Sequence, residues 1–234
     1  MTTVVLLPGL ACDAELWRDQ LPVLAARHVV QLSEVHARCD TLPAMAAALL
    51  AQTLGRLVLV GASMGGMVAL EVLRQAPHRV RGAALLGSTA RPDTPELITL
   101  RSQAIELFAA GRMDEVLRAN VAFAFHPAGA ASAVLVDRYL AMVRRAGADA
   151  LIRQNRAVMV RADSRPLLPH IGCPLLVVCG EADALTPPEH AQEIAALAPQ
   201  ARLEIVAAAG HMLTLEQPAR VNAVLLDWLG SLSA

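Results

Sequence analysis

The chain has 234 residues, which is long enough for one domain with a sizeable hydrophobic core, or for one domain that carries an insertion. Its composition, 55% apolar and 18% charged, is typical of a globular protein, and its net charge of −1 gives no support for binding to nucleic acid or to a membrane surface. All twenty basic residues are arginine, which excludes a lysine Schiff base and a P-loop lysine.

Neither a membrane span nor a secretion signal is predicted. No apolar run approaches the roughly 18 residues that a spanning helix needs, and the opening sequence MTTVVLLPGL has no basic segment before its apolar run. We therefore expect a soluble, cytoplasmic protein. The four cysteines show no metal-ligand spacing, so we expect buried reduced thiols, no metal and no cofactor.

Strands and helices are predicted to alternate along most of the chain. In chain order the expected elements are strand 3–7, helix 13–26, strand 29–32, helix 42–54, strand 56–61, helix 64–75, strand 80–87, strand 174–180, helix 188–197, strand 202–210 and helix 218–229. Strands that are continuous apolar runs, each followed by a helix, favour a parallel sheet covered on both faces. The sequence therefore predicts the α/β class, a doubly wound, mostly parallel sheet of about six strands, formed by residues 1–90 and 166–234.

Residues 91–165 interrupt this alternation and are predicted to form a helical cap. Four helical patterns fall at 95–111, 113–125, 131–147 and 148–160, with no convincing strand among them. The segment holds eleven arginines against eight carboxylates. Solvated helix faces explain this mild basic excess, and a docking patch for an acidic partner such as an acyl carrier protein is the alternative.

One short motif points to nucleophilic catalysis. Gly61-Ala62-Ser63-Met64-Gly65 matches G-x-S-x-G and lies between a predicted strand and a predicted helix, which is the context of a nucleophile elbow. The strained turn demands nearly side-chain-free neighbours, and the helix that begins there directs its amides at the site. A glycine-rich turn without catalysis is the alternative.

Two residues farther along supply the partners that a lone serine lacks. Asp183 follows strand 174–180 and His211 follows strand 202–210, so both are expected at the sheet edge that carries Ser63. The chain order Ser, Asp, His is that of an α/β-hydrolase. A turn-forming aspartate and a loop histidine are the plain alternatives, and Asp93, after strand 80–87, is a competing acid that a helix-capping role would also explain.

The motifs PGL, GASMGG, GEADALTPP and GHM occur in this order, and with them the chain resembles the α/β-hydrolase superfamily over nearly its whole length. It is similar to small cofactor-free serine hydrolases with a helical cap, among them carboxylesterases, enol-lactonases and the pimeloyl-carrier-protein methyl ester esterase. The resemblance implies Ser63 as nucleophile, His211 as base and Asp183 as acid, with the backbone N–H groups of Leu10 and Met64 as oxyanion hole.

Two features depart from the family pattern. Pro8-Gly9 stands where many relatives have His-Gly, and the chain begins directly at its first strand, which suggests a six-stranded sheet without an N-terminal edge hairpin.

The resemblance implies hydrolysis of a carboxylic ester through an acyl-enzyme. Aromatic residues make up 3% of the chain, so we expect an aliphatic pocket for a small or medium acyl group, lined by Phe123, Phe125 and Met212. Lactonase, thioesterase or acyltransferase activity on the same residues is the alternative, and a non-catalytic binding protein of the same fold is a further one.

Overall fold

The computed structural model describes residues 3–232, and within them six strands form one sheet in the order β2-β1-β3-β4-β5-β6. The strands are β1 (Thr3–Leu7), β2 (Val29–Leu32), β3 (Leu57–Ala62), β4 (Val80–Leu86), β5 (Leu175–Gly180) and β6 (Ala201–Val206). Each of the five neighbouring pairs is parallel. The predicted fold class is therefore confirmed, with a sheet that is parallel throughout.

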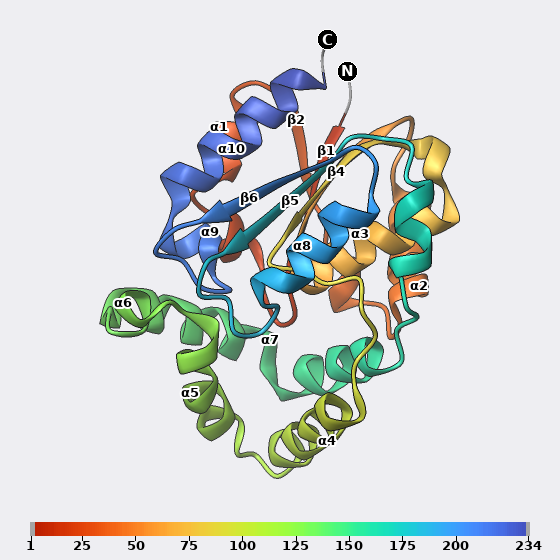
Figure 1. Ribbon diagram of the computed structural model, residues 1–234. Helices are drawn as coiled ribbons and strands as arrows, with labels where there is room; N and C mark the ends of the chain where they lie inside the picture. Colours follow the sequence, from red (N-terminus) through yellow and green to blue (C-terminus); the bar gives the residue numbers. More distant parts are fainter. Residues whose placement is uncertain (1–2, 233–234) are drawn as a thin grey trace.

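Helices pack on both faces of this sheet (Figure 1). One face carries α1 (Leu21–Ala25) and α10 (Pro218–Ser231), and the other carries α2 (Leu42–Gln52), α3 (Met64–Gln75) and α8 (Pro188–Leu197). Successive residues of a strand point to opposite faces, so in β1 Val4 and Leu6 join the core on the first face, while Val5 and Leu7 join the core on the second. Burial on both faces explains why the central strands β1, β3 and β5 are mostly apolar.

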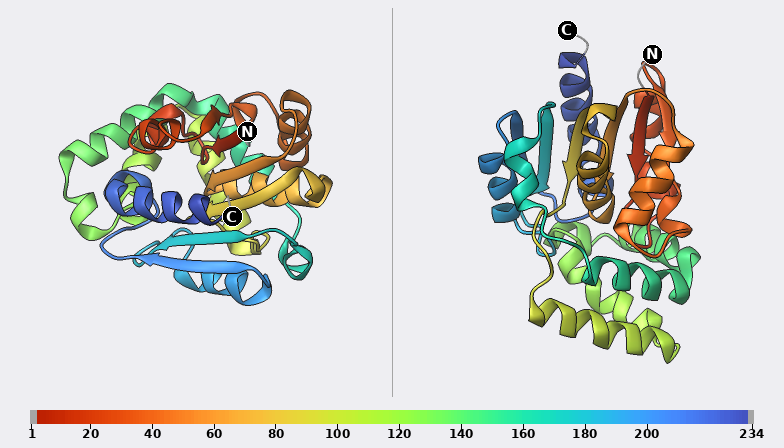
Figure 2. Two further views of the ribbon diagram at one scale, coloured as in Figure 1. Left: turned by 90° about the horizontal axis from the view of Figure 1, so that it is seen from above. Right: turned by 90° about the vertical axis from the view of Figure 1, so that its right-hand side faces the viewer.

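The segment 91–165 is helical, and its helices gather beyond the carboxyl ends of the strands (Figures 1 and 2). They are α4 (Pro95–Ala109), α5 (Met113–Ala124), α6 (Pro127–Ala130) and α7 (Ala133–Met159). The last two predicted patterns form α7, which is interrupted at Gly147, where φ is +81°. The single turn α6, which begins at Pro127, was not predicted. We call residues 91–165 the helical insertion.

The predicted helix 13–26 is wrong as one continuous element. It consists of the 3₁₀ turn η1 (Ala14–Trp17) and the short helix α1. Proline fits only the first turn of a helix because it lacks an N–H group, and Pro22 accordingly lies in the first turn of α1. Asp13 does cap η1 as expected, since its carboxylate accepts the Glu15 N–H at 2.9 Å.

The predicted strand 202–210 is too long, because β6 ends at Val206. The backbone then turns at Ala208, whose φ is +53°, and the exposed Glu181 carboxylate accepts the Ala208 N–H there. After the turn comes α9 (Leu213–Glu216), which was not predicted. No helix within residues 3–232 has the length and apolar character needed to cross a membrane.

Candidate active site

The turn between β3 and α3 holds Ser63 in a strained backbone conformation. Its φ is +51° and its ψ is −116°, a combination that residues with a side chain rarely adopt. The Ser63 N–H donates to the Leu86 carbonyl at the end of β4 (2.8 Å), and the Ser63 carbonyl accepts the Gly66 N–H (2.9 Å). The serine is therefore fixed from both sides at the carboxyl edge of the sheet.

Glycines make this turn possible by letting three backbone segments approach each other. A Cβ atom on Gly61 would lie 2.3 Å from the Gly65 carbonyl oxygen, and one on Gly65 would lie 2.0 Å from the Leu7 carbonyl oxygen. Real Cβ atoms do not make such contacts, so β1, β3 and α3 can pack this closely only with glycine at both positions. This is the local geometry that the G-x-S-x-G motif predicts.

Asp183 and His211 form a buried pair at the same edge. The His211 Nδ1 atom lies 2.8 Å from Oδ2 and 3.0 Å from Oδ1 of Asp183, and the two residues are 7% and 2% exposed. The carboxylate also accepts the Thr186 N–H (2.8 Å) and the Thr186 hydroxyl (2.9 Å). Burial alone would raise the pKa of Asp183, but the His211 ring and the bonds from Thr186 outweigh it and hold that pKa below its ordinary value.

The end of β4 brings Ser63 and this pair together. Ser63 is bonded to Leu86, and the next residue is Gly87, whose φ is +50°. A Cβ atom on Gly87 would lie 3.2 Å from Asp183 Oδ2 and 3.3 Å from His211 Nδ1. The three residues predicted to be catalytic therefore surround one strand end.

The Gly9–Cys12 turn after β1 lies against the serine. It is closed by the bond from the Cys12 N–H to the Gly9 carbonyl (3.1 Å), and a Cβ atom on Gly9 would lie 3.3 Å from the Ser63 Cβ. Within residues 3–232, neither the Leu10 N–H nor the Met64 N–H donates to a protein acceptor. Met64 is also the first residue of α3, where the helix dipole is positive. Both amides therefore lack an acceptor among the described residues.

Asp93, the competing acid, forms ion pairs with two arginines. Its buried carboxylate lies 2.6 Å from Arg161 and 2.7 Å from Arg101, both in the helical insertion. The helix cap suggested for it is wrong, because Thr94 is the N-cap of α4. In the part of the chain that the structure describes, His211 has Asp183 as its carboxylate partner.

The three residues expected to line the substrate pocket have different surroundings. Phe125 is 2% exposed and packs edge-on against Tyr139, and Met212 is 7% exposed, with its N–H bonded to the Ala124 carbonyl (3.0 Å). Phe123 is 54% exposed, so its place in the substrate pocket stays a prediction. Phe125 follows the last residue of α5, where the backbone has become extended, and its side chain is buried.

A half-buried carboxylate that no sequence motif marks anchors the loop of His211. Glu216 accepts the Gly210 N–H and the His126 N–H, each at 2.8 Å. Burial, together with the nearby charge of Asp183, raises the pKa of Glu216. The side chain therefore joins the residue before His211 to the helical insertion. The sequence carries no local signal for this role, because Glu216 ends the stretch MLTLE and the polar Gln217 follows it.

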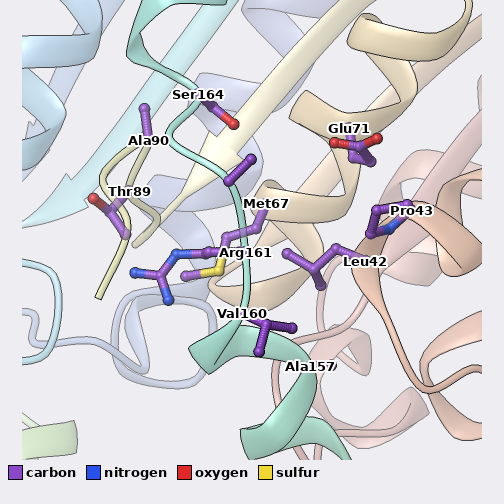
Figure 3. A pocket seen from close by; sticks show the side chains of 11 residues that line it. Leu42, Pro43, Met67, Glu71, Thr89, Ala90, Ala157, Val160, Arg161 and Ser164 are labelled. Carbon is purple, nitrogen blue, oxygen red and sulfur yellow. The ribbon is translucent and has the colours of Figure 1, made fainter. Parts of the chain in front are cut away.

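A cavity of about 130 Å³ lies between α2, α3, the loop after β4 and the end of α7 (Figure 3). Figure 3 shows Leu42, Met67 and Arg161 among the side chains that line it. None of the three predicted catalytic residues is among them. Across residues 3–232, no group of three or more His, Cys, Asp or Glu side chains is arranged to hold a metal ion.

The arginines of the helical insertion are mostly paired within the protein. Nine of its eleven arginines form ion pairs with carboxylates. Arg118 and Arg156 are exposed and form no ion pair with the described residues. The basic excess noted in the sequence is therefore largely neutralised within the protein.

Comparison with known proteins points to one family. The model of the alpha/beta hydrolase family matches residues 4–224. The pimeloyl-[acyl-carrier protein] methyl ester esterase of Edwardsiella ictaluri is 30% identical over 240 residues, which cover 96% of this chain and 92% of that protein. The biotin biosynthesis bifunctional protein BioHC of Cellvibrio japonicus is 27% identical over 253 residues, and the match covers 98% of this chain but only 48% of that protein.

Among solved structures, a thermophilic esterase from Thermogutta terrifontis superposes with a TM-score of 0.90 at 27% identity. The match covers 100% of this chain and 91% of the esterase. The similarity therefore extends over the sheet and the helical insertion alike.

Proposed function

The chain belongs to the alpha/beta hydrolase family and is an enzyme, and on this premise we propose that it is a serine hydrolase that cleaves carboxylic esters of small or medium acyl groups. The observation that carries the proposal is the buried Asp183–His211 pair, with 2.8 Å between carboxylate and imidazole, beside the strained turn of Ser63. The similarity to two esterases supports an ester as substrate.

In the first half of the reaction, His211 activates Ser63. Its Nδ1–H donates to Asp183, which leaves Nε2 as the basic nitrogen. As the Ser63 oxygen bonds to the ester carbonyl carbon, its proton passes to Nε2, and the negative oxygen that forms is bound by the Leu10 and Met64 N–H groups. His211 then returns the proton to the departing alkoxide, and an acyl-enzyme remains.

In the second half, water takes the place of the serine hydroxyl. His211 removes a proton from the water while its oxygen bonds to the acyl carbon, and the same two amides bind the second oxyanion. Collapse of this intermediate breaks the bond to Ser63, which recovers its proton from His211, and the carboxylic acid leaves. The ionised Asp183 stabilises the imidazolium in both halves.

The helical insertion is proposed as a cap domain that selects the substrate, since α4–α7 lie beyond the sheet edge that carries Ser63 (Figure 2). A free small molecule is favoured over an acyl group on a carrier protein. The reason is that nine of the eleven arginines in the insertion already pair with carboxylates of this chain.

The test is a series of p-nitrophenyl esters of increasing chain length, together with a fluorophosphonate probe that labels activated serines. We expect an adduct on Ser63, no turnover by Ser63→Ala, and a kcat about 10³- to 10⁴-fold lower for Asp183→Asn. Asp93→Asn is the matched control, because it neutralises a second buried aspartate that does not contact His211. An unlabelled Ser63 in folded protein, or normal activity of Asp183→Asn, would overturn the proposal.

A further inference from the structure

The turn that carries the Leu10 N–H is held by a side chain from the helical insertion. The Ala11 N–H, one residue later, donates to Gln154 Oε1 at 2.6 Å. Gln154 lies on α7 and is 1% exposed, so this bond is shielded from water. Its amide nitrogen donates in turn to the His36 carbonyl at 3.0 Å.

His36 also bonds to the same turn. Its Nε2 atom lies 2.8 Å from the Cys12 carbonyl oxygen, and because a carbonyl only accepts, this nitrogen carries a proton. The Nδ1 atom has no partner among the described residues, and burial lowers the pKa of His36, which fits a neutral ring. Gln154 and His36 therefore hold the N–H and the carbonyl of two successive residues, Ala11 and Cys12.

The turn needs this support because its backbone is strained. Ala11 has a φ of +53°, a region that alanine rarely adopts without being held there. The peptide between Leu10 and Ala11 is the central peptide of the turn, and rotation of this plane is the movement that would relieve the strain. The bond to Gln154 fixes that plane, and with it the neighbouring peptide that carries the Leu10 N–H.

We propose that Gln154 is a positioning residue for the oxyanion hole, acting through the Gly9–Cys12 turn. This inference rests on the proposed function, since it assumes that the Leu10 N–H binds the oxyanion of a serine hydrolase. Gln154 does not touch the substrate in this role. It fixes one of the two amides that bind the transition state, so its loss should lower kcat and leave substrate binding nearly unchanged.

The test compares Gln154→Met, which keeps the length of the side chain and removes both hydrogen bonds, with Gln154→Glu, which keeps an acceptor for the Ala11 N–H. The assays are ester turnover and inhibition by a trifluoromethyl ketone, which forms an oxyanion on addition of the serine. For Gln154→Met we expect kcat to fall about tenfold, the inhibition constant to rise about tenfold and KM to stay within about twofold. Gln154→Glu should recover part of both losses.

Asn155→Ala is the matched control, because Asn155 is the next buried amide of α7 and bonds to Leu151 and Arg101 instead of the turn. We expect its kcat and inhibition constant, per fluorophosphonate-reactive site, to stay within about twofold of the natural protein. If Gln154→Met behaves likewise, or if Asn155→Ala loses as much as Gln154→Met, the inference is wrong.

Hydrogen exchange of the peptide covering residues 8–13 gives a readout that does not depend on activity. We expect faster exchange in Gln154→Glu than in the natural protein, and still faster exchange in Gln154→Met. If Gln154→Met does not fold, Gln154→Ala takes its place, since it also lacks an acceptor for the Ala11 N–H. Unchanged exchange together with an unchanged inhibition constant in that variant would refute the role. Failure of the proposed function is recognised separately, because the natural protein would then neither turn over esters nor react with the fluorophosphonate, and the positioning role would fall with it.

Discussion

Substitution of Glu216 by glutamine should weaken both the fold and catalysis. The two carboxylate oxygens of Glu216 accept one backbone N–H each, from Gly210 and from His126, both at 2.8 Å. A glutamine of the same size has one carbonyl oxygen and one NH₂ group, so one of the two N–H groups would face another donor. The variant therefore removes one hydrogen bond and leaves its half-buried partner unsatisfied.

The magnitude follows from two opposing effects. An N–H left without an acceptor costs about 1–3 kcal/mol, and the gain is that no charge has to be buried at position 216. A carboxylate with two backbone donors already has much of that burial offset, so the loss should dominate. We expect the free energy of unfolding to fall by about 1–2 kcal/mol at pH 7. Since Gly210 precedes His211, we also expect kcat to fall about tenfold.

Denaturant unfolding at several pH values provides the assay. The raised pKa of Glu216 means that the folded state binds its proton more tightly than the unfolded state does. This contribution to stability is fully present below the unfolded value near 4.5, and is lost as the pH rises through the folded pKa. Glu216→Gln lacks it, so the stability gap between the natural protein and the variant should shrink as the pH rises above 4.5.

Glu181→Gln is the matched control for this experiment. Its carboxylate accepts a single N–H, that of Ala208 in the same loop, and it is exposed to solvent. A glutamine can still accept that bond, so stability and kcat should change little. The reasoning is refuted if Glu216→Gln unfolds like the natural protein at every pH with an unchanged kcat, or if Glu181→Gln loses as much.

Three further substitutions test the packing around the site and on α10. Gly65→Ala would place a Cβ atom 2.0 Å from the Leu7 carbonyl oxygen and should lower the free energy of unfolding by about 3 kcal/mol or more. Gly230→Ala on α10 is the control, because no atom lies within 4 Å of its added Cβ, and it should raise the free energy of unfolding by about 0.5–1 kcal/mol. Thermal unfolding measures both changes. Asp93→Asn leaves the buried Arg161 without its carboxylate and should lower the free energy of unfolding in urea by about 3 kcal/mol. The kcat of the folded fraction should not change. An unchanged urea midpoint would contradict this account of the ion pair.

The sheet could be predicted because its strands obey simple local rules. The central strands β1, β3 and β5 are runs of mostly apolar, buried residues, which makes them easy to recognise. The edge strands β2 and β6 contain polar residues and are mostly half-buried or exposed. The predicted helices 64–75 and 188–197 match α3 and α8 residue for residue. Where prediction failed, backbone details decided the outcome. The end of β6 depends on the conformation of Ala208, and the break before α1 depends on Pro22.

The candidate site was predictable for a different reason. Ser63, Asp183 and His211 each follow a strand, and the carboxyl ends of parallel strands meet at one edge, so their proximity follows from topology. Glu216 and Gln154 escaped prediction because their partners are backbone groups at distant positions, such as His126 and Ala11. No periodicity or motif records which backbone group a side chain will reach.

The same two residues change the part that the helical insertion plays. It contacts the core at two places, through Gln154 at the Gly9–Cys12 turn and through the His126 N–H, which donates to Glu216 beside the His211 loop. A segment that only selected substrates could vary freely without altering the chemistry. Here the insertion fixes the backbone next to His211, the proposed base, and next to Leu10, one proposed oxyanion donor. Substitutions in α5 or α7 that shift these contacts should therefore change kcat for every ester, whereas substitutions that reshape the pocket should change the preference among esters.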